Sequence, residues 1–252
     1  MGAAKFILKA LNTLVSAVLV LALLLAGGYS AYALWDNARI YAAADAVQEG
    51  LRSLKPEASD DAAARSASFR ELQAINPDVY AWLTLDGTNI DYPVLQGSDN
   101  TTYLNTDAYG DFALSGSIFL DSSNQPDFTD SYNLIYGHHM DQHKMFGDLD
   151  FYKDEAFFRS NHTGTLTLPD RTYHLEIFAY LLVPASESAI FSPGQWRADI
   201  GGVLAFARQN AVYSDESTLS RLEQAQGAQI LALSTCAADY TDARTVILAA
   251  ME

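Results

Sequence analysis

Residues 229–236 read QILALSTC and residues 244–250 read RTVILAA, so two short apolar runs flank a polar connection. Runs of this length, bounded by polar residues, are typical of buried β-strands. Two such strands joined by a short loop predict a hairpin, in which Cys236 ends the first strand and Arg244 opens the second. The hairpin therefore brings Cys236 and Arg244 to the same loop.

Six further apolar runs upstream have the length and turn-bounded spacing of strands. The eight predicted strands are 81–85, 90–95, 117–120, 133–136, 164–168, 173–183, 229–235 and 245–250. Short strands that do not alternate with long helices favour a closed or nearly closed β-barrel over a parallel α/β sheet. The connection between Val183 and Gln229 is longer than a turn, and residues 200–212 within it have helical spacing. We therefore expect a mainly β fold with a helix inserted before the strand that ends at Cys236.

The composition is that of a folded protein, because 49% of the 252 residues are hydrophobic and 18% are charged. One compact domain is the expected count. The formal net charge of −16 repels phosphate backbones and argues against nucleic acid as a partner. Residues 1–39 do not share the acidic excess, since they carry three basic side chains against Asp36 alone.

The N-terminal part is typical of a membrane segment. No side chain between Ala10 and Trp35 is charged, and this length matches the ~20 residues that span a bilayer. Lys5 and Lys9 precede the run, so the positive-inside preference places the N-terminus in the cytoplasm and the rest of the chain outside the cell. A cleaved signal peptide is the alternative, because residues 31–33 (Ala-Tyr-Ala) have the pattern of a cleavage site. The length of the apolar run favours an uncleaved anchor, followed by a helical lead-in at 36–54 and 66–74.

Cys236 is the only cysteine of the chain, so it cannot form an internal disulfide. A small buried apolar residue is the ordinary alternative for such a cysteine. The predicted strand at 133–136 leads into Tyr136-Gly137-His138-His139-Met140 and delivers two histidines to a loop. A thiolate nucleophile, an imidazolium that protonates a leaving amine and a guanidinium that holds an oxyanion are what acyl transfer at a thiol requires. Cysteine, histidine and Arg244 could supply these groups.

Several motifs in order give the chain a recognisable resemblance between about Phe69 and Ala250. They are INPDV at 75–79, IDYPV at 90–94, QGSDN at 96–100 with Tyr103 and Leu104, GSIFLD at 116–121, YGHHM at 136–140 with MFG at 145–147, and LSTC at 233–236 with Arg244. This set resembles the class B sortases, membrane-anchored cysteine transpeptidases of Gram-positive bacteria. The resemblance implies an eight-stranded sortase β-barrel with N-terminal helices and a helix before the cysteine strand.

The resemblance also implies the roles of the site residues. Cys236 would be the nucleophile, His138 the acid/base partner, and Arg244 the cation that stabilises the oxyanion or orients the substrate. His138 is chosen over His139 because the histidine of the family directly follows the Tyr-Gly pair. Four further positions match residues that line the sorting-signal groove in similar enzymes: Asn100, Leu104, Tyr136 and Ser234. An acidic residue follows the cysteine in some class B relatives, and Ala237 stands there in this chain, which puts a substrate contact from that position in doubt.

The implied reaction has two steps, in which a sorting signal near the C-terminus of an exported protein is cleaved and its acyl group passes to an amine. The amine would come from a peptidoglycan precursor or a pilin, and no cofactor is expected. We expect a cytoplasmic N-terminus at 1–9, a single transmembrane anchor at 10–35, a helical lead-in at 36–75 packed on the catalytic domain, and an extracellular catalytic barrel at 76–252. A cysteine peptidase that only hydrolyses and an exported binding module with a structural cysteine are the rival classes.

Other chemistry-bearing residues have simpler interpretations. His139 and His143 are four apart, but no third ligand with metal-site spacing follows, so no metal is expected. His162 and His174 fit surface or hydrogen-bonded structural positions. Arg244 could instead pair with Asp239 or Asp242. The acidic residues at 148, 150 and 154 lack the glycine and terminal glutamate of a calcium loop and are more simply a solvated face.

Overall fold

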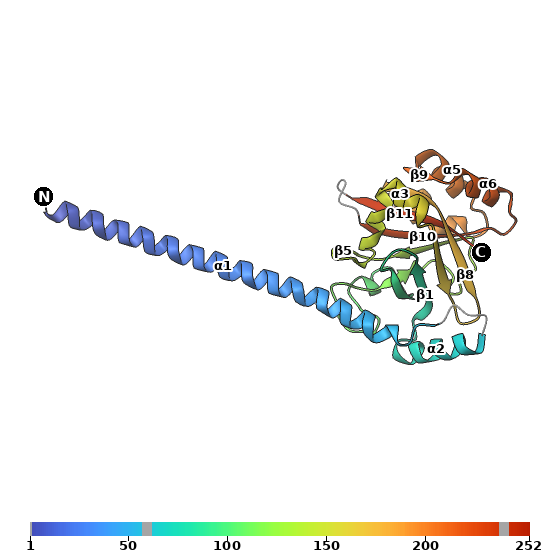
Figure 1. Ribbon diagram of the computed structural model, residues 1–252, viewed down its shortest axis with the longest axis horizontal. Helices are drawn as coiled ribbons and strands as arrows, with labels where there is room; N and C mark the ends of the chain where they lie inside the picture. Colours follow the sequence, from blue (N-terminus) through green and yellow to red (C-terminus); the bar gives the residue numbers. More distant parts are fainter. Residues whose placement is uncertain (1, 57–61, 237–241) are drawn as a thin grey trace. The chain divides into compact units, whose positions relative to one another are not determined.

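The computed structural model describes residues 2–56, 62–236 and 242–252, and for Cys236 it describes the backbone alone. Helix α1 spans Gly2–Arg52 and helix α2 spans Ala62–Ile75. The chain forms two compact units, residues 1–43 and 44–252 (Figure 1). The described part of the first unit is continuous helix, and none of its most apolar stretch is buried. By length and composition this helix could cross a membrane, and a signal sequence near an N-terminus would have the same features.

Eight strands of the described residues close into a barrel. They are β1 (Val79–Leu85), β2 (Asp91–Leu95), β3 (Ile118–Leu120), β4 (Tyr132–Tyr136), β7 (Thr163–Thr167), β8 (Thr172–Pro184), β10 (Gln229–Cys236) and β11 (Ala243–Met251). Their order is β11-β10-β4-β3-β2-β1-β7-β8, and pairing of β8 with β11 closes the ring. The predicted strands and the mainly β barrel are confirmed, with every strand end within two residues of its predicted place.

Two of the pairings in the barrel are parallel, β2 with β3 and β4 with β10, while the others are antiparallel. The predicted last hairpin is present, with Cys236 opposite Arg244 in the register. Because β4 and β10 run in the same direction, their C-terminal ends meet at one edge, where Tyr136 is the register partner of Ser234. This edge brings the two chemistry-bearing motifs together.

Shorter elements fill the connections. They are η1 (Thr102–Leu104), β5 (His139–Met140), β6 (Lys144–Met145), η2 (Gly147–Lys153), α3 (Glu155–Ser160), α4 (Ser188–Phe191), η3 (Pro193–Trp196), α5 (Gly201–Asn210), β9 (Tyr213–Ser214) and α6 (Glu216–Gln224). The helix predicted at 200–212 is α5, and it packs with α6 on one side of β8 (Figure 1). Asp215 caps α6 by accepting a hydrogen bond from the backbone N–H of Thr218.

Strands β10 and β11 are apolar on both faces because both faces are covered. Leu231, Leu233 and Ile247 belong to the core cluster that includes residues of β1 and β2, whereas the alternate residues Ala232 and Val246 belong to a second cluster with residues of α5 and α6. A side chain in a strand alternates between these two faces. The inserted segment therefore explains why these strands are apolar throughout. A third cluster packs α2 and the last turns of α1 on β1 and β2.

Candidate functional site

A pocket of about 300 Å³ opens at the edge where β4, β10 and β11 meet. It is lined by Asn100, Leu104, Phe119, Tyr136, Gly137, His138, Ala185, Phe191, Ser234, Thr235 and Arg244. Six of the seven residues predicted for the site line this one pocket. The seventh, Cys236, follows Thr235 at the end of β10, and its side chain lies outside the described residues. Ala237 also lies outside them.

His138 reaches the pocket because β4 ends one residue before Gly137. The backbone N–H of Gly137 donates to the carbonyl of Ser234 on β10, at 3.1 Å. A Cβ at position 137 would lie 2.5 Å from Ile118 Cδ1 and 2.7 Å from a ring carbon of Phe146. Any larger residue at position 137 would have to displace Ile118 or Phe146, so glycine fits this close approach best.

The imidazole of His138 is oriented by a backbone carbonyl. Its Nε2 lies 2.8 Å from the carbonyl oxygen of Leu104, at the end of η1. Since a carbonyl oxygen only accepts, Nε2 is the protonated nitrogen in this arrangement. In the neutral ring Nδ1 is then the basic nitrogen, so the site holds one tautomer.

Arg244 is the second residue of β11 and half-buried, and its Nη1 donates to the carbonyl of Ala243 at 3.0 Å. Within residues 2–56, 62–236 and 242–252, no carboxylate forms an ion pair with Arg244, including Asp242. Asp239, the other predicted alternative partner, lies outside the described residues. The guanidinium thus lines the pocket with donors that can meet an oxygen of a bound acyl group.

One wall of the pocket is organised around the buried carboxylate of Asp121. Its Oδ2 accepts hydrogen bonds from Asn100 Nδ2 at 2.8 Å and from the Tyr136 hydroxyl at 3.0 Å. Burial, together with the charge and hydrogen bond of Asp121, raises the pKa of Tyr136 well above its usual value. The Tyr136 hydroxyl is therefore a fixed neutral donor.

Aromatic residues that the sequence analysis did not select complete the pocket. The Tyr136 ring lies 5.4 Å from the ring of Phe119 and 6.5 Å from that of Phe191, with which it is stacked. Phe119 falls within the motif quoted at 116–121, so the motif could have indicated it. Phe191 comes from the connection before β10, and no local pattern links it to Tyr136.

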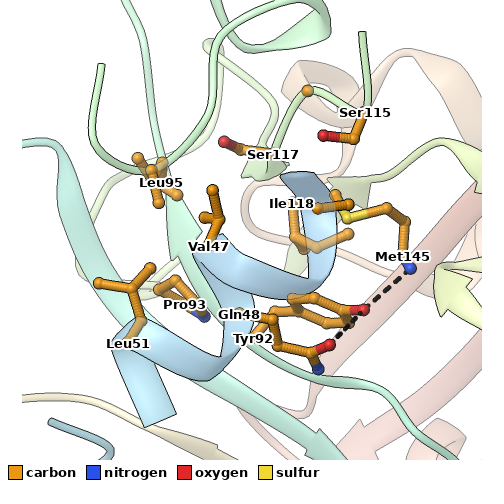
Figure 2. Close-up of a pocket in the computed structure, with 13 residues that line it drawn as sticks. Val47, Gln48, Leu51, Tyr92, Pro93, Leu95, Ser115, Ser117, Ile118 and Met145 are labelled. Carbon is orange, nitrogen blue, oxygen red and sulfur yellow. Dashed lines mark hydrogen bonds between the residues drawn. The ribbon is translucent and has the colours of Figure 1, made fainter. Parts of the chain in front are cut away.

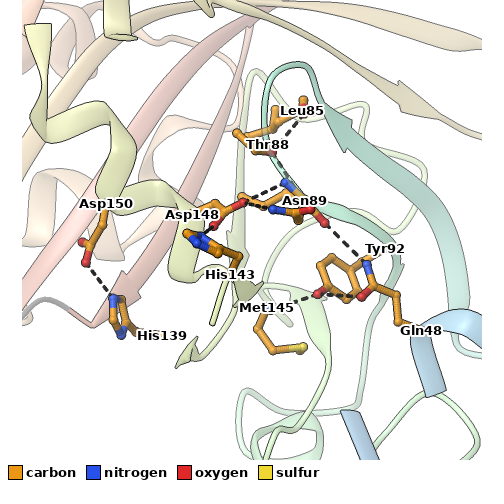
Figure 3. A network of polar contacts seen from close by, with 11 residues as sticks. Gln48, Leu85, Thr88, Asn89, Tyr92, His139, His143, Met145, Asp148 and Asp150 are labelled. Carbon is orange, nitrogen blue, oxygen red and sulfur yellow. Dashed lines mark hydrogen bonds and ion pairs between the residues drawn. The ribbon is translucent and has the colours of Figure 1, made fainter. Parts of the chain in front are cut away.

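The histidines that follow His138 contact two separate carboxylates (Figure 3). His139 Nε2 lies 2.8 Å from Asp150 Oδ2, and His143 Nδ1 lies 2.7 Å from Asp148 Oδ1. The prediction that Asp148 belongs to a solvated face is wrong, because only 1% of its side chain is exposed. It is buried because three donors satisfy its oxygens, including the backbone and side-chain N–H groups of Asn89. Asp154 is exposed as predicted, and it caps α3.

His162 and His174 are both exposed, in keeping with their predicted surface positions. Their backbones are paired, His162 with Ile177 and His174 with Glu252.

A second, narrower cavity of about 30 Å³ lies under the last turns of α1 (Figure 2). Val47 and Leu51 face Pro93 across it, and Met145 closes one side. This volume holds little more than one water molecule. Its lining is mainly apolar, and the Tyr92 hydroxyl is already bonded to Gln48 and to the backbone of Met145. The cavity is a gap in the packing and shares no lining residue with the pocket of His138.

The geometry has parallels in known proteins. Residues 83–252 match the family model described as the sortase domain. The chain is 35% identical over 181 residues to the Sortase B of Listeria monocytogenes, covering 71% of this chain and 72% of that protein, and 28% identical over 183 residues to the Sortase B of Staphylococcus aureus, covering 72% and 73%.

Solved structures agree with the sequence relatives. A mutant form of the sortase B of Clostridium perfringens superposes with a TM-score of 0.70 at 32% identity, covering 81% of this chain and 96% of that one. A class B sortase of Streptococcus pyogenes involved in pilus biogenesis superposes with a TM-score of 0.66 at 36% identity, covering 73% and 97%. The family model, the sequence relatives and the solved structures all point to the same family. This chain therefore belongs to the sortase family of cysteine transpeptidases, as a class B member.

Proposed function

We propose that the pocket is the transpeptidation site, with Cys236 as nucleophile, His138 as acid and base, and Arg244 as the cation that stabilises the oxyanion. The observation that supports this most is the convergence of His138 and Arg244 on one pocket at the end of the strand that Cys236 terminates. Asn100, Leu104, Tyr136 and Ser234, which line the same pocket, would contact the sorting signal.

The proposed reaction proceeds through a thioester. The Cys236 thiolate attacks a peptide carbonyl, and the C–N bond breaks as the His138 imidazolium protonates the leaving amine. A second amine then attacks the thioester carbonyl, gives its proton to the neutral imidazole and expels the thiolate. Arg244 would stabilise the oxyanion formed in both steps.

We further propose that residues 10–35 anchor the chain in the cell membrane, with residues 1–9 in the cytoplasm and the lead-in (36–75) and catalytic barrel (76–252) outside. Cys236 is the only thiol of the chain, so a membrane-impermeant maleimide tests the orientation. Intact cells should label as fully as permeabilised cells. Labelling only after permeabilisation would contradict the proposed orientation.

The substrates are a sorting-signal peptide of an exported protein and an amine. A peptidoglycan precursor is one source of the amine, and a pilin is the other, which is supported by the similarity to a sortase involved in pilus biogenesis. The class B resemblance suggests a signal that begins Asn-Pro or Ser-Pro.

The test uses the full chain in detergent with a series of fluorogenic peptides whose motif begins Asn-Pro or Ser-Pro, with and without glycylglycine. A new amide product seen by mass spectrometry supports transfer. Cleavage without that product indicates a hydrolytic peptidase, and no reaction with any peptide supports a binding module.

Variants test the assignment of roles. Cys236→Ala, His138→Ala and Arg244→Ala should each lower turnover at least about 100-fold while the circular dichroism spectrum stays unchanged. The acyl-enzyme should appear as an added peptide mass on the wild-type chain and be missing from Cys236→Ala. Near-normal turnover by Cys236→Ala would end the enzyme assignment.

A further inference from the structure

The β5–β6 hairpin directly follows His138, so its position bears on that residue. The backbone N–H of Phe146, one residue after β6, donates to the carbonyl of His138 at 3.0 Å. Three non-glycine residues of this hairpin have positive φ: +58° at Gln142, +63° at His143 and +51° at Met145. Such a backbone is costly and persists when surrounding contacts hold it.

The contact at the tip of the hairpin is the bond between His143 and Asp148. Asp148 is buried, and its other oxygen accepts from the backbone N–H of Asn89 at 2.7 Å and from its side chain at 2.9 Å (Figure 3). The His143 ring also lies 5.2 Å from the ring of Phe151. Because a carboxylate only accepts, His143 Nδ1 is the donor of this 2.7 Å bond. A buried, directional acceptor thus fixes the tip.

The base of the hairpin is held from the same side by η2. His139 Nε2 contacts Asp150 Oδ2, and Lys153 Nζ lies 3.1 Å from Asp150 Oδ1. Burial by itself would raise the pKa of Asp150, but the hydrogen bonds and charges of His139 and Lys153 outweigh it and lower the pKa below the usual value. Asp150 therefore stays an ionised acceptor for β5.

The other strand of the hairpin is held from α1 and β2. The backbone N–H of Met145 donates to the Tyr92 hydroxyl at 2.9 Å, and that hydroxyl donates to Gln48 Oε1 at 3.2 Å (Figure 3). Lys144 forms an ion pair with Asp45. The hairpin is thus fixed on both edges, and the His143–Asp148 bond is the contact that reaches the most deeply buried group.

We propose that His143 is a positioning residue, which acts through Asp148 to hold the hairpin and thereby the imidazole of His138 against the Leu104 carbonyl. This inference rests on the proposed function, since it takes His138 as the acid and base. A hairpin released at its tip lets the backbone of His138 shift, and displacement of a catalytic group by ~1 Å lowers the rate up to about 100-fold.

Two nearly identical substitutions test the proposal in the full chain. In His143→Asn an amide nitrogen occupies the place of Nδ1 and can still donate to Asp148, whereas His143→Asp brings a second carboxylate against it. Both side chains tolerate positive φ, so the pair differs only in whether position 143 presents a neutral donor or a negative charge to Asp148. We expect His143→Asp to lower kcat about 10-fold to 100-fold with little change in KM. His143→Asn should keep most of the wild-type kcat.

A second measurement does not depend on turnover. Chains with ¹⁵N-labelled histidine report the tautomer of His138, whose signals are identified as those missing from His138→Gln. The wild type and His143→Asn should show a protonated Nε2, and His143→Asp should show a mixture of both tautomers. His162→Asp is the control, because His162 is exposed and lines a separate pocket to which no residue of the β5–β6 hairpin contributes, and it should change neither quantity.

The outcomes separate this proposal from the proposed function. A mixed tautomer in His143→Asp together with unchanged turnover by His138→Ala would retain the positioning effect and reject the catalytic role of His138. An unchanged tautomer and kcat in His143→Asp would overturn the positioning proposal while leaving the function intact. If His143→Asp does not fold, His139→Gln and His139→Glu make the same comparison at Asp150, because glutamine keeps a donor at the place of Nε2 and glutamate does not.

Discussion

The Nε2 atom of His138 and the carbonyl oxygen of Leu104 lie 2.8 Å apart, so a backbone group does the orienting that a carboxylate does in many acid–base pairs. The carbonyl is fixed because η1 is fixed. The buried Tyr103 hydroxyl donates to Asp78 Oδ2 at 2.7 Å, and the Tyr103 carbonyl accepts from the backbone N–H of Ser117 at 3.0 Å. The tautomer of His138 therefore depends on the loop before β3.

Gly116 makes this dependence testable. A Cβ at Gly116 would lie 2.5 Å from the carbonyl oxygen of Tyr103 and 2.6 Å from that of Leu104, and its φ is +55°. We predict that Gly116→Ala pushes the Leu104 carbonyl away from His138 and lowers kcat about tenfold or more. Steady-state kinetics with the fluorogenic peptide that the wild type cleaves fastest measures the kcat of both chains.

Gly110→Ala is the matched control for Gly116→Ala. Gly110 also has positive φ, at +88°, but a Cβ there meets nothing within 4 Å. Gly110→Ala should lower the free energy of unfolding by about 1–2 kcal/mol through backbone strain, and its kcat should stay that of the wild type. Equal losses of kcat in the two variants would mean that strain, and not the Leu104 carbonyl, controls the rate.

The strands could be predicted because their information is local. Runs such as 229–236 are apolar, short and bounded by polar residues, and each became a strand near its predicted bounds. The parallel pairing of β4 with β10 could not be predicted, since it joins residues about a hundred positions apart without a local signal. That pairing is what brings His138 to the end of the cysteine strand.

The site was predicted by resemblance more than by pattern. Asn100 and Tyr136 share Asp121 as an acceptor, a contact that no spacing in the sequence indicates. Asp148 was predicted to belong to a solvated face, where most carboxylates lie. Its burial depends on donors from Asn89 and His143, and these are brought together by a turn whose positive φ angles are carried by residues other than glycine.

Asp121 should control substrate affinity through the pocket wall. Its oxygens accept from four donors, two on Ser123 and one each on Asn100 and Tyr136. Asp121→Asn replaces one acceptor with a donor that faces these groups. We predict a loss of about 1–3 kcal/mol in the free energy of unfolding and a rise in KM, about threefold to tenfold, that exceeds the change in kcat.

Asp127→Asn serves as the comparison for Asp121→Asn in urea unfolding and peptide kinetics. Asp127 likewise accepts from a backbone N–H and a hydroxyl, but both belong to Thr129, which does not line the pocket, whereas Asp121 accepts from Asn100 and Tyr136, which do. The KM of Asp127→Asn should remain that of the wild type. If Asp121→Asn also left KM unchanged, Asp121 would be a structural residue only.

Arg244 should not be replaceable by lysine. A guanidinium presents several donors in a fixed plane, and one of these is already used on the carbonyl of Ala243. A lysine carries its three donors on one nitrogen, so it lacks the fixed fork that can serve that carbonyl and an oxyanion from separate nitrogens. We predict that Arg244→Lys retains the fold and still loses about 100-fold in kcat/KM. Recovery of more than a tenth of the wild-type value would show that charge alone suffices.

Ionisation of the Tyr92 hydroxyl should lower the free energy of unfolding of the barrel in alkaline solution. Burial is the main cause that raises the pKa of its hydroxyl from 10.0 to about 12, with the charge of Asp148 adding to it and the hydrogen bond from the Met145 backbone opposing it. A group whose pKa is raised in the folded state contributes its full stability below the unfolded pKa and loses it as the pH rises through the folded pKa. The window for Tyr92 is therefore from about pH 10 to about pH 12.

The measurement compares the wild type with Tyr92→Phe, so that other groups that titrate in the same range cancel. The free energy of unfolding in urea, followed by tryptophan fluorescence, should be higher for the wild type below pH 10, where the hydroxyl bridges Gln48 and Met145. That difference should shrink by up to about 3 kcal/mol as the pH approaches 12. A difference that stays constant across this range would mean that the Tyr92 hydroxyl ionises as easily in the folded chain as in the unfolded one, and that its bridge between α1 and the hairpin is open to solvent.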